Sequence, residues 1–275
     1  MQSNLKQQFE NDGYLIINNF LDEKTIKNLR DNFSKAKDEK KYLGFYSWRD
    51  YEKFIGDLLT NKKLNLIKEI YNEPILYPDF QVQISNSPKK LLRPHWDLQS
   101  FLRYNKMKTI QDIKYSKVGI YLQDSDIYNS GSIHYVPNSH KSFFYSLKRP
   151  KRLLSYINTL RKKYFTKKQV VMKLKAGDML IFNGKLLHSS SPKNGNIKKI
   201  SFYMSLLGDK KSLKYYLSNE ILRMANDITT SNENSDHRIE YVFSKEKISK
   251  FKNNSIIPIF VIDQNSILDL KKKFI

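Results

Sequence analysis

Three residues with metal-binding side chains stand at two distant places in the sequence. His95 and Asp97 are two residues apart, and on a β-strand this spacing points both side chains to the same face. His188 comes much later, just after an apolar strand predicted over residues 179–182. Two imidazoles and one carboxylate on one face suit non-haem Fe(II) and leave coordination positions open for reactants. The sequence therefore predicts an iron site formed by His95, Asp97 and His188.

The other histidines have simpler interpretations. We expect His134 to pack within a strand and His140 to order the turn at residues 137–141, whereas His237 is expected on the surface. A His-x-Asp pattern alone is also compatible with a surface histidine beside a turn aspartate. The prediction of a metal site therefore depends on the elements that surround the three residues.

Those elements are predicted to be mainly strands. Between residues 75 and 207, short runs rich in Val, Ile, Tyr and Phe are separated by turn clusters, which is typical of a β-sandwich or barrel. The clearest predicted strands are residues 80–85, 118–123, 132–136, 179–183 and 200–206. Such strands can fold back beside one another and bring distant ligands together.

Helices are predicted on either side of these strands. A helix ends near Gly13, a strand follows over residues 14–17, and Asp22 caps a helix that runs to about Glu39. Two further helices are expected over residues 63–72 and 213–228. We expect one domain over residues 1–209 and a helical or mixed extension over residues 210–275.

A basic segment interrupts the strands. Residues 141–168 hold ten Lys or Arg and no acidic residue. Apolar residues recur there at helical spacing, which predicts an amphipathic helix, namely Leu153, Ile157, Leu160 and Tyr164. The segment is either a solvated helix face or a surface that attracts an anionic small molecule or carrier-linked substrate. In the second case the contacts would come from Arg149, Lys151 and Arg152.

Composition excludes several classes of protein. With 40% hydrophobic and 13% aromatic residues, the 275-residue chain can bury a sizeable core, so wholesale disorder is excluded. The net charge of +22 would allow non-specific binding to nucleic acid, but we find no DNA-reading motif, so a nucleic-acid partner is not expected.

The absence of cysteine excludes disulfides and thiolate metal sites. Without an export signal or an apolar run of roughly 20 residues, we expect a cytoplasmic protein with no transmembrane segment.

Four passages carry a resemblance to a known family. They are F-x-x-D-G-Y at residues 9–14, Pro94–Asp97 with the His-x-Asp pair, the turn at residues 131–141, and residues 176–190. The turn reads G-x-I-x-x-x-P-N-S-H-K, with Asn138 where the family usually has Gly. Together they resemble the phytanoyl-CoA dioxygenase family of Fe(II)- and 2-oxoglutarate-dependent oxygenases over most of residues 9–207.

This resemblance implies a fold and a reaction. The fold is mainly β with flanking helices, a double-stranded β-helix (a cupin-like jelly roll) with iron at its open end. The ligands are His95, Asp97 and His188, the cosubstrates are 2-oxoglutarate and O2, and the default outcome is hydroxylation of a C–H bond. Because Asp97 retains the carboxylate that related halogenases replace with a small residue, halogenation is disfavoured.

One position departs from the family pattern. Eleven residues after the distal histidine, where the family usually has an Arg that pairs with the far carboxylate of 2-oxoglutarate, this chain has Lys199. A lysine keeps the charge but loses the bidentate fork of arginine, so the Ser190 hydroxyl is expected to assist it. Strand parity places Ser201 on the same face as Lys199, and Gln83 is a further candidate contact.

Two other functions stay open at this point. The protein could be an iron oxygenase or oxidase that does not use 2-oxoglutarate, with Lys199 serving the substrate instead. It could also be a non-catalytic binding protein on the same fold, although the intact set of three ligands argues against that.

Overall fold

A computed structural model describes part of the chain, namely residues 5–34, 62–71, 74–85, 94–99, 101, 112–125, 131–142, 154–191, 199–216 and 219. The chain forms two compact units. Unit 1 comprises residues 1–44, 82–99 and 116–203, and unit 2 comprises residues 45–81, 100–115 and 204–275. All three predicted iron ligands belong to unit 1.

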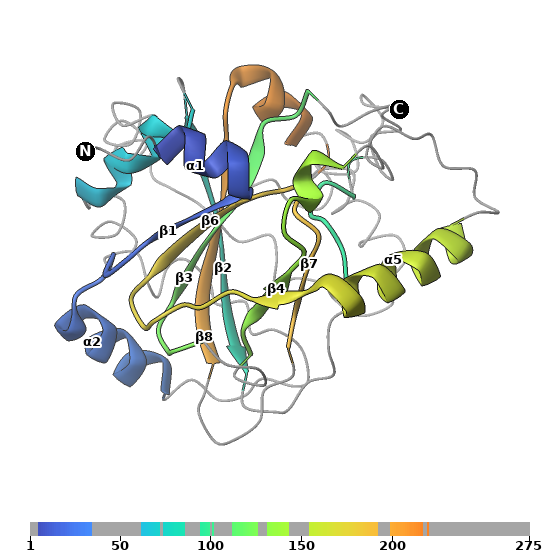
Figure 1. Cartoon of the computed structure of the whole chain (residues 1–275). Helices are drawn as coiled ribbons and strands as arrows, with labels where there is room; N and C mark the ends of the chain where they lie inside the picture. Colours follow the sequence, from blue (N-terminus) through green and yellow to red (C-terminus); the bar gives the residue numbers. More distant parts are fainter. Residues whose placement is uncertain are drawn as a thin grey trace, which may run out of the picture. The chain divides into compact units, whose positions relative to one another are not determined.

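Two β-sheets form the framework of the fold (Figure 1). A five-stranded sheet has the order β1-β6-β3-β8-β2, and a three-stranded sheet has the order β5-β4-β7. The five strands of the larger sheet are β1 (Tyr14–Ile17), β2 (Ile75–Ser85), β3 (Tyr115–Tyr121), β6 (Met179–Asn183) and β8 (Lys199–Leu207). Those of the smaller sheet are β4 (Ile133–Tyr135), β5 (Val170–Val171) and β7 (His188–Ser190). The pairs β1–β6, β3–β6, β4–β5 and β4–β7 are antiparallel, as a jelly roll requires.

The predicted strands are confirmed, with small shifts at their ends. β1 and β6 have the predicted bounds, β2 begins earlier than expected, and β3 ends at Tyr121 rather than Gln123. The Gln123 side chain has a different task, since its Oε1 accepts a hydrogen bond from the Ile200 N–H at 2.7 Å.

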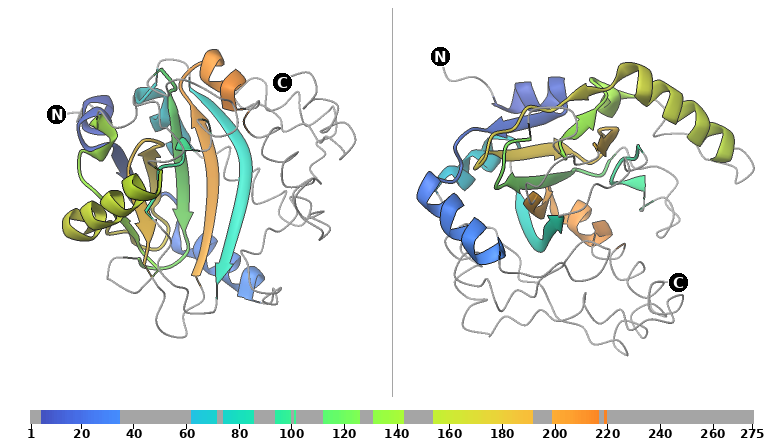
Figure 2. Two further views of the ribbon diagram at one scale, coloured as in Figure 1. Left: turned by 90° about the vertical axis from the view of Figure 1, so that its right-hand side faces the viewer. Right: turned by 90° about the horizontal axis from the view of Figure 1, so that it is seen from below.

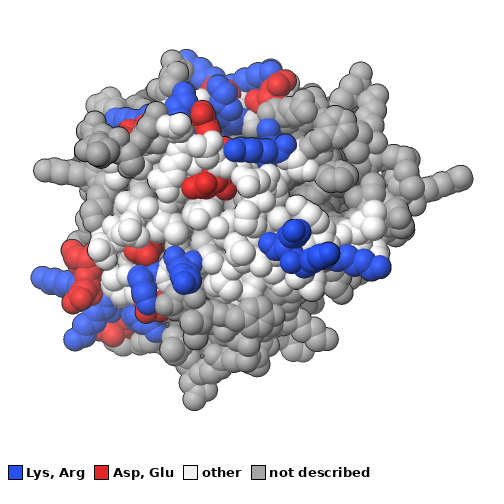
Figure 3. All heavy atoms as spheres, in the orientation of Figure 1, with Lys and Arg blue, Asp and Glu red and all other residues white. Residues whose placement is uncertain are grey.

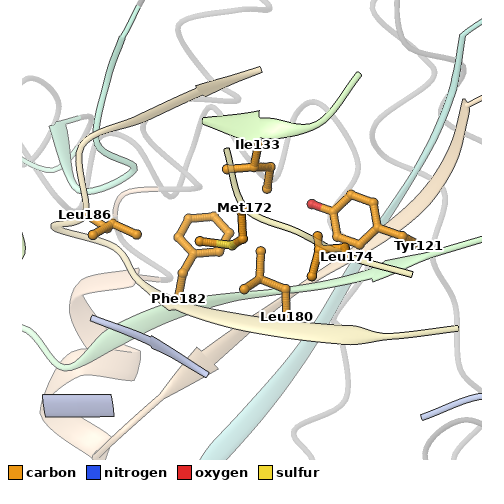
Figure 4. Packing of buried hydrophobic residues seen from close by; sticks show 7 residues of the cluster. All are labelled: Tyr121, Ile133, Met172, Leu174, Leu180, Phe182 and Leu186. Atoms are coloured by element: carbon orange, nitrogen blue, oxygen red, sulfur yellow. The ribbon is translucent and has the colours of Figure 1, made fainter. Parts of the chain in front are cut away.

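The core of unit 1 lies between the two sheets. It joins residues of β3, β4 and β6 with residues of the segments that follow β5 and β6, as Figure 4 shows. The cluster consists of Tyr121, Ile133, Met172, Leu174, Leu180, Phe182 and Leu186. Leu180 and Phe182 are two residues apart on β6, so both point to the same side of the larger sheet. This packing holds the sheets at a fixed separation next to His188.

Among its described residues, unit 1 has the helices α1 (Leu5–Asp12), α2 (Glu23–Ser34), η3 (Ser139–Lys141) and α5 (Leu154–Lys168). α1 ends at Gly13, whose φ of +79° allows the chain to turn directly into β1. Asp22 caps α2 as predicted, because its Oδ1 accepts a hydrogen bond from the Thr25 N–H at 2.7 Å.

The helix predicted within the basic segment exists as α5, over residues 154–168. Two residues of its apolar stripe, Leu160 and Tyr164, are 46% and 51% exposed, whereas Phe165 is fully buried. The reason lies at the end of the helix, where Gln169 Oε1 lies 3.0 Å from Nδ1 of the buried His134. Residues four apart share one helix face, so this contact turns Phe165 inward and the apolar stripe outward.

Unit 2 contains a helical turn and a buried aromatic cluster. The expected helix over residues 63–72 is instead a 3-10 helix, η2 (Lys62–Glu69), and the helix expected from Leu213 already begins at residue 210. The Tyr115 and Tyr216 rings stack with centroids 5.6 Å apart.

The predicted boundary at residues 209–210 stays a prediction, because residues 220–275 lie outside the described part of the chain. Within that part, no helix combines the length and apolar character needed to cross a membrane.

Candidate metal centre

Backbone hydrogen bonds bring the two halves of the site together. The His95 N–H donates to the His188 carbonyl and the His188 N–H donates to the His95 carbonyl, both at 2.9 Å. This reciprocal pair sets the two histidines directly opposite each other, with ring centroids 4.4 Å apart. The relative positions of the two imidazoles are therefore fixed by strand register.

Alternation along residues 95–98 places the carboxylate beside them. Trp96 and Leu98 are 4% and 0% exposed and point into the core, so His95 and Asp97 point to the opposite face. The Leu98 N–H also donates to the Gly184 carbonyl at 3.2 Å, which ties this segment to the turn after β6. The predicted arrangement of the His-x-Asp pair is what the structure contains.

The three side chains form a group that fits a metal ion. Asp97 Oδ1 lies 3.8 Å from His95 Nε2 and 3.7 Å from His188 Nε2, and all three ligand atoms lie within 4.8 Å of one another. Adjacent ligands of an octahedral ion are about 3 Å apart, so small side-chain rotations would close the group around one ion. Two imidazole nitrogens and one carboxylate oxygen are the donors that non-haem Fe(II) prefers.

The environment of His188 prepares it for this role. Its Nδ1 lies 2.9 Å from the Leu186 carbonyl oxygen, so Nδ1–H donates there and the lone pair of Nε2 faces Asp97. Burial, together with repulsion from His95, lowers the pKa of His188 to about 4. The imidazole is therefore neutral at physiological pH, as a ligand must be.

The turn at residues 137–141 supports β7. The Leu187 N–H donates to Ser139 Oγ at 2.9 Å, and the Leu187 carbonyl accepts from the Val136 N–H at 3.0 Å. Asn138 adopts the left-handed conformation, with φ of 59°, that the more usual glycine would adopt. These residues of the turn therefore position the strand that carries His188.

His140 connects the same turn to α1. Its Nε2 lies 3.1 Å from the Glu10 carbonyl oxygen, and its ring covers the α-carbon of Gly13, where a β-carbon would lie 2.4 Å from Nδ1. The expectation that His140 orders this turn is consistent with these contacts. His134 is buried in β4 as expected, and His237 lies outside the described residues.

The interior of unit 1 also contains a buried lysine. Lys199, at the start of β8, is 5% exposed, and its Nζ donates to the Gly131 carbonyl at 2.6 Å. The Nζ also lies 6.0 Å from the centre of the Tyr121 ring, at the outer limit of a cation–π contact. A β-carbon on Gly131 would lie 3.0 Å from Lys199 Cδ, so glycine leaves the space that this side chain occupies.

Tyr121 lies near the lysine and Tyr203 lies next to Tyr121, and the sequence analysis did not identify Tyr121 as part of the site. The hydroxyl oxygens of Tyr121 and Tyr203 are 3.5 Å apart. Burial raises the pKa of Tyr121 well above its usual range, with further contributions from Tyr203 and from the charge of Asp97. The feature of the sequence that could have identified it is Gly119, because a β-carbon there would lie 3.1–3.2 Å from the side chains of both tyrosines.

Among the other predicted contacts to 2-oxoglutarate and substrate, the structure describes the side chains of Ser201 and Ser190 only. Ser201 is fully buried on β8, and its Oγ has no hydrogen-bond partner among the described residues. Ser190 is half-buried on β7, two residues after His188 and therefore on the same face. Gln83 lies on β2, but its side chain is outside the described part of the structure. The predicted substrate contacts Arg149, Lys151 and Arg152 also lie outside the described residues.

The sequence matches the phytanoyl-CoA dioxygenase (PhyH) family over residues 36–200, which is more than half of the chain. The chain therefore belongs to this family. The match includes the His-x-Asp pair, the turn at 131–141 and the distal histidine, whereas the F-x-x-D-G-Y passage precedes it. A search of curated proteins found no significant match.

Several solved structures share the fold. HygX from Streptomyces hygroscopicus, solved with nickel and 2-oxoglutarate, has a TM-score of 0.58 and 16% identity, covering 76% of this chain and 88% of HygX. The 2-oxoglutarate-dependent epimerase SnoN from nogalamycin biosynthesis has a TM-score of 0.54 and 14% identity, covering 74% and 81%. The carbocyclase SnoK of the same biosynthesis has a TM-score of 0.55 and 13% identity, covering 75% and 84%. At these identities the likeness establishes the jelly-roll fold alone.

Proposed function

We propose that the protein is an Fe(II)- and 2-oxoglutarate-dependent oxygenase that hydroxylates a C–H bond of a small, anionic or carrier-linked substrate. One observation carries the proposal. The same interior holds a two-histidine, one-carboxylate group and a buried lysine beside a serine hydroxyl that has no partner among the described residues. A dicarboxylate would use both groups at once.

The spacing along β7 supports the binding of a five-carbon dicarboxylate. Ser190 is two residues after His188, and two residues span about 6.6 Å along a strand. Ser190 is paired in register with Ile133, two residues after Gly131, whose carbonyl holds the Lys199 ammonium. One carboxylate would therefore lie at the metal and the other near Ser190 and Lys199.

Lys199 can bind that carboxylate without giving up its present contact. A lysine ammonium has three protons, and one is donated to the Gly131 carbonyl. Two protons are left for an anion, and the Ser201 hydroxyl can donate a further hydrogen bond. These contacts would take over the role that the bidentate arginine has elsewhere in the family.

The three metal ligands and the residues that contact His188 would have separate roles. His95, Asp97 and His188 would hold Fe(II), which supplies, when bound, the oxidising chemistry that couples O2 to the loss of CO2 from 2-oxoglutarate. The neutral tautomer of His188, fixed by Leu186, keeps a lone pair available at Nε2. Phe182, whose ring centroid is 4.8 Å from that of His188, keeps water away from the buried side of the group.

Hydroxylation is the reaction we propose among those that the fold supports. The balance is one O2, one 2-oxoglutarate and one C–H bond giving one alcohol, succinate and CO2. Structures with this fold include enzymes described as an epimerase and a carbocyclase, so the protein around the substrate decides the outcome. A small-molecule substrate is supported by HygX, which has been solved with hygromycin B bound. The basic segment at residues 141–168 favours an anionic one.

The first experiment is succinate release from 2-oxoglutarate in the presence of Fe(II) and O2. We expect slow release without a primary substrate and faster release when phosphorylated or carboxylated metabolites are screened. An iron enzyme that does not use 2-oxoglutarate would give no succinate but would still bind Fe(II). A non-catalytic binding protein would do neither, so the three hypotheses give three different results.

A further inference from the structure

Exposed apolar side chains gather on α5 and on β5, the strand that follows it. Leu160, Tyr164 and Val170 are 46%, 51% and 41% exposed, and they are the large apolar side chains exposed among the described residues. All three fall within eleven consecutive positions. Single exposed apolar residues are normal on a protein surface, but a group confined to one short segment indicates a binding surface.

The arrangement around the helix adds charge to this surface. At 100° per residue, Leu160 and Tyr164 lie about 40° apart, with Lys163 and Lys167 on one side of them and Lys168 on the other. The three lysines are exposed, and Phe165 packs on the opposite, buried side. We call this set the basic–apolar stripe, and it consists of Leu160, Lys163, Tyr164, Lys167 and Lys168.

No acidic residue balances the stripe within its own segment. Residues 141–177 contain no Asp or Glu. In Figure 3 the side chains over α5 show Lys and Arg without Asp or Glu among them, whereas the two kinds are mixed over α2. Figure 2 shows α5 extending outward from the sheets. A surface of this kind is complementary to a negatively charged partner.

The C-terminal end of α5, where the stripe ends, is connected to the candidate metal centre through the smaller sheet. Val170, which follows α5, is paired in register with Tyr135 of β4, and Tyr135 is paired with His188 of β7. Three strands at a spacing of 4.7–4.9 Å put the backbone of Val170 about 10 Å from that of His188. A partner bound at the stripe would therefore lie beside the site.

We propose that the basic–apolar stripe docks the protein on the surface of an anionic lipid bilayer. Leu160 and Tyr164 would enter the boundary between headgroups and acyl chains, and the lysines would contact lipid phosphates. A second copy of the chain is disfavoured, because each copy carries a net charge of +22. Nucleic acid would attract the lysines but gives no place for an apolar centre. The side of a single helix is convex, so it suits a bilayer, which requires no matching groove, better than an acidic protein.

The test is co-sedimentation of the full-length chain with phosphatidylcholine vesicles that contain phosphatidylglycerol, and with pure phosphatidylcholine vesicles. One variant neutralises the stripe, K163Q/K167Q/K168Q, and another removes its apolar centre, L160S/Y164S. The matched control, K6Q/K24Q/K27Q, removes the same charge from exposed lysines of α1 and α2. No Fe(II) or 2-oxoglutarate is added, so the result is independent of the proposed oxygenase activity. Circular dichroism establishes that each variant is folded.

We expect binding to the anionic vesicles, little binding to the neutral ones, and release at about 0.5 M salt. Each lysine near an anionic surface strengthens binding roughly fivefold, so the triple lysine variant should bind about a hundredfold more weakly. The L160S/Y164S variant should lose about tenfold on vesicles and nothing on heparin, which has charge but no apolar interior. The control should keep most of its affinity.

Three results would overturn the proposal. The first is an absence of binding to anionic vesicles at low salt. The second is an equal loss in the control variant, which would mean that the attraction comes from the charge of the whole molecule. The third is unchanged vesicle binding in L160S/Y164S, which would leave a purely electrostatic surface suited to an acidic protein or another polyanion.

Discussion

The two ends of the interior of unit 1 are built in different ways. At the metal end, the ligands stand on two segments joined by reciprocal backbone hydrogen bonds between His95 and His188. At the other end, Lys199 reaches the Gly131 carbonyl through four methylene groups, and its position depends on what the neighbouring side chains leave free. One end is set by strand register and the other by side-chain packing. Changes at the two ends should therefore have separable effects.

The largest effect is expected at the metal end. His188→Ala removes one of three ligands and the aromatic contact with Phe182, and we expect succinate release to fall by at least about a thousandfold. Fe(II) affinity should fall as well. His237→Ala is the control, because that histidine is predicted to have no part in the site. Retention of activity in His188→Ala would mean that the metal end lies elsewhere.

The next effect is expected at the lysine end. Lys199→Ala should raise the KM for 2-oxoglutarate by about 30-fold, because a charge-assisted hydrogen bond to a buried carboxylate is lost. Fe(II) affinity should stay unchanged, in contrast to His188→Ala. Lys173→Ala, which removes an exposed lysine, is the matched control. An unchanged KM would show that Lys199 serves something other than the cosubstrate, and Lys199→Arg should recover part of the affinity.

A smaller effect should come from the turn that supports β7. Ser139→Ala leaves the buried Leu187 N–H without its acceptor, which should lower the free energy of unfolding by about 1–2 kcal/mol. Because Leu187 precedes His188, Fe(II) affinity should fall severalfold while the KM for 2-oxoglutarate changes little. Chemical denaturation and metal titration measure the two effects. A change in KM alone would contradict the separation between the two ends.

The smallest effect is expected for Ser201→Ala. The hydroxyl has no partner among the described residues, so its removal should leave the free energy of unfolding within about 0.5 kcal/mol of the original. If the hydroxyl binds 2-oxoglutarate, the KM should still rise by about threefold to tenfold. Equal KM values for the variant and the original protein would remove Ser201 from the lysine end.

The sequence was informative where local rules decide the structure. The alternation of His95, Trp96, Asp97 and Leu98 required only the period of a strand, and in the structure half-buried and buried residues alternate there as predicted. The strands β1 and β6 were also predictable from local sequence, because each is a short apolar run bounded by turn residues. Asp22 and Gly13 marked the ends of helices through their side-chain chemistry and backbone freedom.

Features set by tertiary contacts were not predictable in this way. The stripe on α5 faces outward because Gln169 meets His134, a contact between residues on different elements that the helical period does not contain. Tyr121 on β3 lies near Lys199 on the neighbouring strand β8, and in the sequence only Gly119 corresponds to the room that the Tyr121 side chain needs. The metal end is therefore visible in the sequence, whereas at the lysine end the sequence identifies Lys199 and Ser201 but not the Tyr121 ring near the lysine.

The central claim is that one Fe(II) ion and one 2-oxoglutarate bind together in this interior. An anaerobic titration of the metal-free protein with Fe(II), followed by visible absorption with and without 2-oxoglutarate, tests it most directly. We predict one equivalent of Fe(II) per chain and a charge-transfer band that needs both components and is lost in His188→Ala. Saturation with Fe(II) and 2-oxoglutarate without such a band, or a band that persists in His188→Ala, would contradict the account.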